Sequence, residues 1–92
     1  MIPAPLSIAD VLDLAVRCEA GERSNSLDVE IEIALFEPDA HYVAARANAA
    51  GTKVIYTRCD HSAVTHLARD WTSRKGTAAV LRARASMMEQ GK

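Results

Sequence analysis

The chain has 92 residues, of which 49% are hydrophobic and 4% aromatic, and its formal net charge is −1. This length supports one modest, mainly aliphatic core, so we expect residues 1–92 to fold as a single domain. The composition excludes a disordered chain, and the charge lacks the basic excess typical of a nucleic-acid-binding domain.

Residues 7–20 are predicted to form the first helix. Ser7 and Asp10 have the spacing of a capping box, in which a hydroxyl and a carboxylate bind free amides of the first helical turn. Gly21 is a natural stop. Apolar residues follow the cap at helical spacing, at Ile8, Val11, Leu12, Ala15 and Val16.

Residues 27–36 fit two descriptions. Val29, Ile31 and Ile33 alternate with acidic residues, as in a half-buried strand. Read as a helix, the same segment has an apolar stripe, a cap at Ser26 and acids in its first turns, where the helix dipole favours them. The periodicity favours the strand and the cap favours the helix. A family resemblance described below also favours the helix.

Residues 41–68 are predicted to form three short antiparallel strands. The expected order is strand, turn, strand, turn, strand, at residues 41–47, 48–51, 53–58, 60–62 and 64–68. Gly51 can take a positive φ in the first turn, and the second strand is rich in strand-forming residues. Because alanine is a strong helix former, a helix over residues 41–50 is the alternative.

Residues 76–90 are predicted to form the last helix, capped by Thr77 or Thr72. One face contains Ala78, Leu81, Ala85 and Met88, widened by Val80 and Met87. Met87 and Met88 either form an adaptable contact surface or belong to a helix packed on the sheet. The fold class is therefore α+β, with two N-terminal helices, a three-stranded antiparallel sheet and a C-terminal helix packed as a layered sandwich.

Several segments of the chain resemble small uncharacterised bacteriophage and prophage proteins of alphaproteobacteria. The segments are residues 27–36, 48–57, 70–72 and 77–83. More distantly, the pattern is similar to the phage ABA-sandwich domain, in which an acidic helix precedes a tyrosine–threonine strand, a tryptophan segment and an alanine-rich helix. The resemblance implies a helix for residues 27–36, a layered α+β fold and a phage or mobile-element setting. It implies no reaction and no catalytic residue.

Charge is sorted by position along the chain. Residues 1–39 contain nine acidic residues and two arginines, a net charge of −7, whereas residues 40–92 contain nine basic and three acidic residues, a net charge of +6. Such asymmetry governs partner choice more than fold. We therefore expect two separate, oppositely charged surfaces that attract a larger assembly or, in a homo-oligomer, a second copy.

Two groups of residues are predicted to contact a partner. The first is a solvent-exposed acidic patch of Glu30, Glu32, Glu37 and Asp39. The second contains Arg69, Trp71 and Arg74. On a helix, Glu30 and Glu32 point about 200° apart, so they are not a close carboxylate pair for acid or metal chemistry.

The best candidate for metal or nucleophile chemistry is Cys59-Asp60-His61 with His66 nearby. Its spacing matches no standard zinc pattern, and no third group is placed to orient a cysteine–histidine pair. The four glycines are scattered, so no phosphate-binding loop is present. We expect a simple turn at this place, and no catalytic residue, cofactor or metal.

We expect a soluble, cytoplasmic, non-enzymatic protein without a membrane partner. No apolar run approaches the roughly 20 residues needed to cross a bilayer. Residues 1–6 lack the basic start of a signal peptide, and two cysteines are too few for a disulfide-stapled secreted domain.

The expected function is that of a phage or mobile-element accessory protein that binds a host protein or protein–nucleic-acid complex. One specific form is inhibition of a defence complex in the anti-CRISPR manner, with acidic residues blocking a basic groove. The alternative is a small nucleic-acid-binding regulator that uses basic side chains and a stacking indole, at Arg58, Arg69, Arg74, Lys75 and Trp71.

Overall fold

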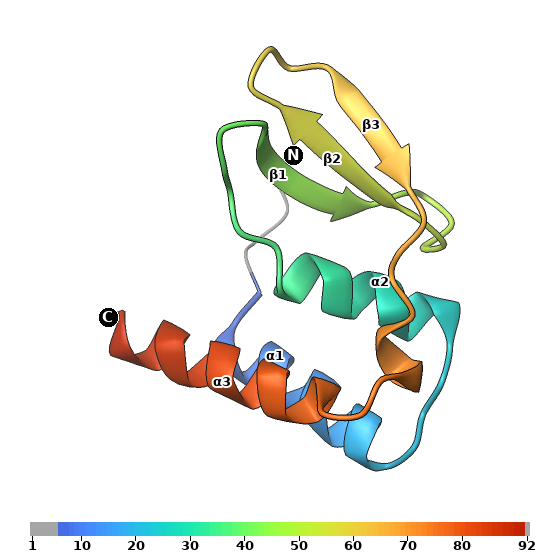
Figure 1. Ribbon diagram of the computed structural model, residues 1–92, viewed down its shortest axis with the longest axis vertical. Helices are drawn as coiled ribbons and strands as arrows, with labels where there is room; N and C mark the ends of the chain where they lie inside the picture. The colour runs from blue at the N-terminus through green and yellow to red at the C-terminus, as the bar shows by residue number, and fades with distance from the viewer. Residues whose placement is uncertain (1–5, 92) are drawn as a thin grey trace.

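The computed structural model describes residues 6–91 and has three layers (Figure 1). Residues 1–5, most of the segment considered for a signal peptide, and Lys92 lie outside the described residues. The elements are, in chain order, α1 (Ile8–Glu19), α2 (Asn25–Ala34), β1 (Tyr42–Ala47), β2 (Val54–Arg58), β3 (Ala63–His66), the 3-10 helix η1 (Trp71–Ser73) and α3 (Thr77–Gln90). Helices α1 and α3 form one layer, α2 the second and the sheet the third. The predicted α+β class and element order are confirmed.

Local sequence signals fix the starts of the helices. The predicted capping box of α1 is confirmed, since the Ser7 hydroxyl accepts from the Asp10 amide at 3.1 Å and the Ser7 amide donates to the Asp10 carboxylate at 3.0 Å. The cap of α2 is Ser24, which accepts from the Leu27 amide. The prediction of Ser26 is wrong because that residue already lies in the first helical turn.

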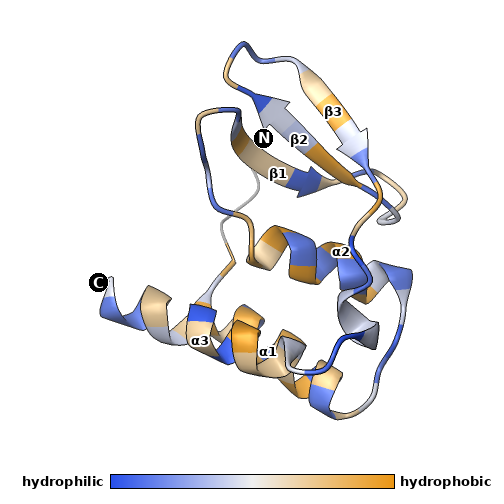
Figure 2. Cartoon of the chain, in the orientation of Figure 1, coloured by the Kyte–Doolittle hydropathy of each residue, from blue (hydrophilic) through white to orange (hydrophobic). Residues whose placement is uncertain are grey.

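The second segment is a helix, as the resemblance implied, and the strand description is wrong. Figure 2 shows hydrophilic and hydrophobic residues alternating along α2. The alternation arises because α2 lies between two layers and is buried on more than one side, including Val29, Ile31 and Glu32. A helix in this position does not need a single apolar face.

The sheet is an antiparallel meander in the order β1-β2-β3, so the predicted strands are confirmed and the helix over residues 41–50 is wrong. Val54 pairs with Ala47 on one side and with His66 on the other. Gly51 has φ +70° in the first turn, a conformation that glycine adopts without steric cost.

The main core lies where α1, α2 and α3 meet. It contains Val11, Leu14, Ala15, Leu27, Ile31, Ala34, Leu81 and Ala85. Val80 and Met87 are 47% and 59% exposed, so the prediction that Val80 widens the packed face of α3 is wrong and Met87 does not pack against the sheet. Only α1 packs extensively on α3, which leaves the flank of α3 in solvent.

The predicted threonine cap of α3 is also wrong. The N-cap is Gly76, with φ +85° and no side chain to bind the free amides. The Thr77 hydroxyl donates to the carbonyl oxygens of Trp71 and Arg74, so it ties η1 to the start of α3.

Replacing Leu81 by alanine should lower the free energy of unfolding by about 2–5 kcal/mol, because this fully buried side chain would leave a cavity. Val80→Ala is the matched control on the same helix and should change it by no more than about 0.5 kcal/mol. Urea denaturation followed by circular dichroism measures both variants. Equal losses would contradict the assigned faces of α3.

Candidate functional site

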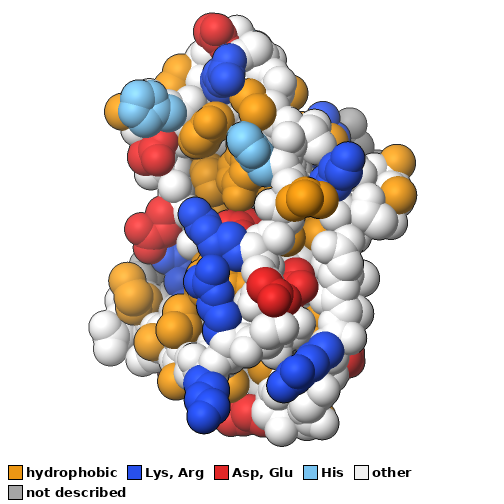
Figure 3. Space-filling view, turned by 45° about the vertical axis from the view of Figure 1, so that its right-hand side comes forward, with side chains coloured by type: hydrophobic (Ala, Val, Ile, Leu, Met, Phe, Trp, Pro, Cys, Tyr) orange, Lys and Arg blue, Asp and Glu red, His pale blue; other side chains and the backbone are white. Residues whose placement is uncertain are grey.

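A groove of about 470 Å³ lies between the end of α2 and the sheet, and we call it the α2–sheet groove. Figure 3 shows hydrophobic side chains exposed between the sheet at the top and basic side chains at the centre of this face. The groove is lined by Glu32, Leu35, Phe36, Glu37, Asp39, Tyr42, Tyr56, His66, Leu67 and Arg69. It therefore combines residues from α2, all three strands and the connections that leave α2 and β3.

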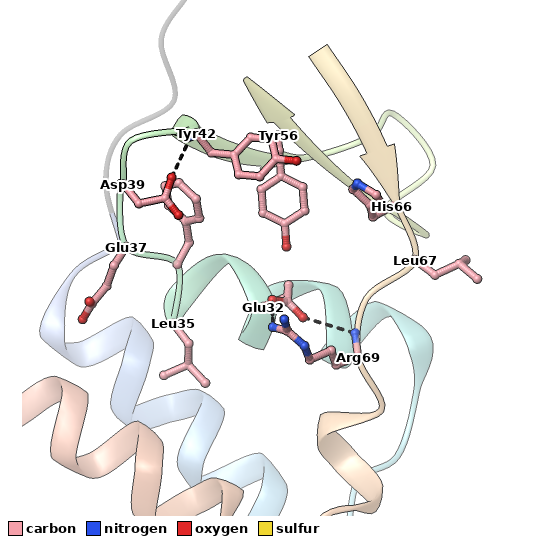
Figure 4. A pocket seen from close by; sticks show the side chains of 10 residues that line it. Glu32, Leu35, Glu37, Asp39, Tyr42, Tyr56, His66, Leu67 and Arg69 are labelled. Carbon is pink, nitrogen blue, oxygen red and sulfur yellow. Dashed lines mark hydrogen bonds and ion pairs between the residues drawn. The ribbon is translucent and has the colours of Figure 1, made fainter. Parts of the chain in front are cut away.

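The Glu32 carboxylate is buried and fully hydrogen-bonded. Its Oε1 accepts from the Trp71 indole N–H at 3.0 Å and from the Arg69 amide at 3.2 Å. Its Oε2 accepts from the Arg69 guanidinium at 2.9 Å (Figure 4). A buried carboxylate is costly unless it is paired and hydrogen-bonded in this way.

Asp28 repeats this role one helical turn earlier. It is 8% exposed, and its Oδ1 accepts from the Thr72 amide at 2.8 Å. Residues four apart lie on the same face of a helix, so Asp28 and Glu32 together hold residues 69–72 against α2. This attachment places Arg69 at the groove.

Aromatic rings form the sheet side of the groove. The Tyr56 ring lies 5.3 Å from that of Tyr42, 5.9 Å from that of Phe36 and 5.8 Å from that of His66, measured between centroids. Figure 4 shows the Tyr56 hydroxyl directed from the sheet toward Glu32. Burial, followed by the negative charge of Glu32, raises the pKa of Tyr56 to about 12.

Two acidic side chains and one leucine lie at the rim. Glu37 is 66% exposed and pairs with Arg84 at 2.7 Å. Asp39 accepts from the amides of His41 and Tyr42, and these bonds, that of Tyr42 first, lower the pKa of the Asp39 carboxyl. Leu67 is 74% exposed, and its side chain extends outward from the edge of the groove into solvent (Figure 4). The groove thus presents three carboxylates, an aromatic wall and one guanidinium.

The predicted acidic patch is divided between two places. Glu32, Glu37 and Asp39 meet at the α2–sheet groove, but Glu32 is only 6% exposed, so the expectation that it lies in solvent is wrong. Glu30 lies beside another hollow, between α1 and α2, and pairs with Arg17 at 3.0 Å. The predicted divergence of Glu30 and Glu32 around the helix is consistent with these separate partners.

The second predicted group is brought together by Glu32. Arg69 and Trp71 both donate to this carboxylate. The Arg74 guanidinium lies over the Trp71 ring, 5.0 Å from its centroid, as in a cation–π contact. The side chains of all three residues therefore already make contacts within the protein, although those of Arg69 and Arg74 remain largely exposed to solvent.

The two oppositely charged halves of the chain do not form separate surfaces. Three arginines of the second half pair with glutamates of the first half, in the pairs Glu19–Arg82, Glu32–Arg69 and Glu37–Arg84. Arg17 pairs with Glu22 and Glu30 within the first half. The expectation of two charged poles is wrong, because folding places many of these charges against one another.

The Cys59-Asp60-His61 segment forms a turn, with the Asp60 carboxylate accepting from the Ser62 amide and hydroxyl. Cys18 is partly buried and Cys59 is exposed, and both cysteines are free. Within residues 6–91, no group of three or more histidine, cysteine or acidic side chains is arranged to hold a metal ion.

The aromatic part of the groove was not predicted from the sequence. Tyr42 and Tyr56 belong to predicted strands, and their positions there identify them only as strand formers. The rings meet because Tyr42 pairs with Arg58 in the antiparallel register, which places it diagonally across from Tyr56.

No protein-family model, curated protein or solved structure matches the chain. None of the helices within residues 6–91 has both the length and the apolar character needed to span a membrane.

Replacing Glu32 by glutamine should lower the free energy of unfolding by about 1.5–3 kcal/mol, because hydrogen bonds to a charged acceptor are lost in a buried place. Glu30→Gln is the matched control two positions earlier and should cost at most about 1 kcal/mol, since its ion pair is exposed. Urea denaturation followed by Trp71 fluorescence compares them. A larger loss for the Glu30 variant would contradict the assigned role of Glu32.

The raised pKa of Tyr56 predicts a specific loss of stability in alkali. Because the pKa is about 12 in the folded protein and 10.0 in the unfolded chain, this stabilisation is intact below pH 10 and is lost as the pH rises toward 12. Ultraviolet absorbance should show one tyrosine that ionises late, and Tyr56→Phe should remove it. Tyr42→Phe is the control, and loss of the late phase in that variant instead would contradict the assignment.

Proposed function

We propose that the protein is a non-enzymatic accessory protein that binds a host macromolecule through the α2–sheet groove. The observation that carries this proposal is the groove itself, in which aromatic rings and carboxylates from distant segments surround one open space. Grooves with an apolar wall and a few fixed polar groups are the usual form of a binding site.

Binding is supported over catalysis by the roles that the polar groups already have. Glu32 is engaged by Arg69 and Trp71, and an Asp39 oxygen is engaged by two backbone amides. Hydrogen bonds of this kind hold the local backbone in place. A catalytic acid or base needs a carboxyl group that is free to exchange a proton with a substrate.

A protein partner is supported by the surface around the groove. Leu67 is exposed beside the aromatic wall, and aromatic residues are enriched at the centres of protein interfaces. The phage or mobile-element setting rests on the resemblance of residues 27–83. In that setting, inhibition of a host defence complex in the anti-CRISPR manner is the specific form that we propose.

The nucleic-acid alternative has less support. A stacking platform requires an open aromatic face, and Arg74 lies over the Trp71 ring while Glu32 holds its N–H. Arg69 is likewise paired with Glu32, whereas Arg58 lies at the far end of β2. The basic side chains therefore do not line one continuous track for a phosphate backbone.

Substitution of Leu67 by lysine should abolish capture of the host partner. Leu67 is 74% exposed, so the change leaves the core intact while it removes an apolar contact at the groove and adds a charge. The experiment is affinity capture from a lysate of the native host, quantified by mass spectrometry.

Met87→Lys is the matched control, because Met87 is also an exposed apolar residue and does not line the groove. A protein retained by the wild type and by Met87→Lys, but lost with Leu67→Lys, supports the proposal. Capture of no partner by the wild type, or equal capture by both variants, would refute it.

A further inference from the structure

The α2–sheet groove already holds one guanidinium group, that of Arg69. Its Nη1 lies 2.9 Å from Glu32 Oε2, but the Arg69 side chain is 63% exposed whereas that of Glu32 is 8% exposed. Within residues 6–91, the other guanidinium nitrogens of Arg69 make no hydrogen bond. The buried carboxylate of Glu32 therefore requires a cationic partner. The Arg69 guanidinium, which now fills that role, is held by one hydrogen bond.

The surroundings of Glu32 suit a planar cation. The rings of Tyr42 and Tyr56 lie close together above it, and guanidinium groups stack on aromatic faces more readily than ammonium groups do. A guanidinium also offers several donors in one plane, so it can bind Glu32 and remain in contact with a ring. Both features favour arginine over lysine as the bound side chain.

The rim favours a basic segment around that side chain. Glu37 and Asp39 are exposed at one end of the groove, where Glu37 is paired with Arg84, and Arg69 is the only arginine or lysine among the described residues that line it. The lining therefore carries more negative than positive charge. Leu67, at the other end, offers an apolar contact to a neighbouring residue of the same segment.

We propose that the groove binds an arginine side chain of a partner protein, whose guanidinium replaces that of Arg69 on Glu32. This inference rests on the proposed function and adds the chemical identity of the group that is recognised. Exchange leaves no buried charge unpaired, because one guanidinium leaves as the other enters. Arg69 then moves into solvent, where most of its side chain already lies.

The test uses three short peptides that differ only in a central arginine, lysine or citrulline. Each is titrated into isotope-labelled protein, and the Trp71 indole N–H resonance is followed because this group donates to Glu32. The arginine peptide should shift that resonance and bind about tenfold more tightly than the citrulline peptide, which has the same shape without the charge. Equal affinity for arginine and citrulline peptides, or for arginine and lysine peptides, would overturn the proposal, as would the absence of any shift.

Arg69→Gln provides a second test. This substitution should tighten binding of the arginine peptide several-fold. The reason is that the Arg69 guanidinium no longer competes with the peptide for Glu32 in the free protein. Arg46→Gln is the matched control, since it removes one exposed positive charge from β1 outside the groove and should leave the affinity unchanged. Weaker binding by Arg69→Gln would refute the exchange, and if that variant does not fold, the wild-type peptide series decides.

Failure of this inference can be distinguished from failure of the proposed function. If Leu67→Lys loses the host partner while the arginine peptide does not bind the wild type, the groove binds its partner through another group. The proposed function then stands and the arginine proposal is wrong.

Discussion

The buried carboxylate of Glu32 connects parts of the chain that are far apart in sequence. It accepts from the backbone and side chain of Arg69, 37 positions away, and from the indole of Trp71, 39 positions away. Because an unpaired carboxylate in this position would be strongly destabilising, the connection from β3 to η1 has to remain on α2. This attachment also keeps Leu67 and Arg69 in the lining of the groove.

Part of the charge asymmetry of the chain is used within the fold. Pairing of Glu19, Glu32 and Glu37 with arginines of the second half links each of the three helical regions to a distant segment. Exposed pairs of this kind contribute little stability individually, so the buried Glu32 is the energetically important member. The same pairing leaves no broad charged pole, and recognition is expected to depend on the local chemistry of the groove.

Features that depend on neighbouring residues were predictable from the sequence. The capping box at Ser7, the turn at Gly51 and the three strands all follow from short-range signals, and each is present. The type of the second element was ambiguous because its alternation reflects burial on more than one side. Hydrophobic periodicity distinguishes a helix from a strand only where one face is buried, and α2 is buried on more than one side.

Features that depend on distant residues were not predictable in the same way. In the sequence, Glu32 is one of several acidic residues with the spacing of a solvent-exposed helix face. Its burial depends on residues 69–71, which lie far away in the sequence and pack against it. The exposure of Val80 and Met87 likewise depends on how many helices pack on α3. The groove is defined by the placement of the sheet over α2, which no local pattern encodes.

The most direct test of this account is a double-mutant cycle between Glu32→Gln and Trp71→Phe, measured by urea denaturation. Phenylalanine keeps an aromatic ring but removes the N–H that donates to Glu32. If the carboxylate organises this part of the fold, the two substitutions should be coupled by about 1 kcal/mol or more. Additive effects of the two substitutions would contradict the central role given to Glu32.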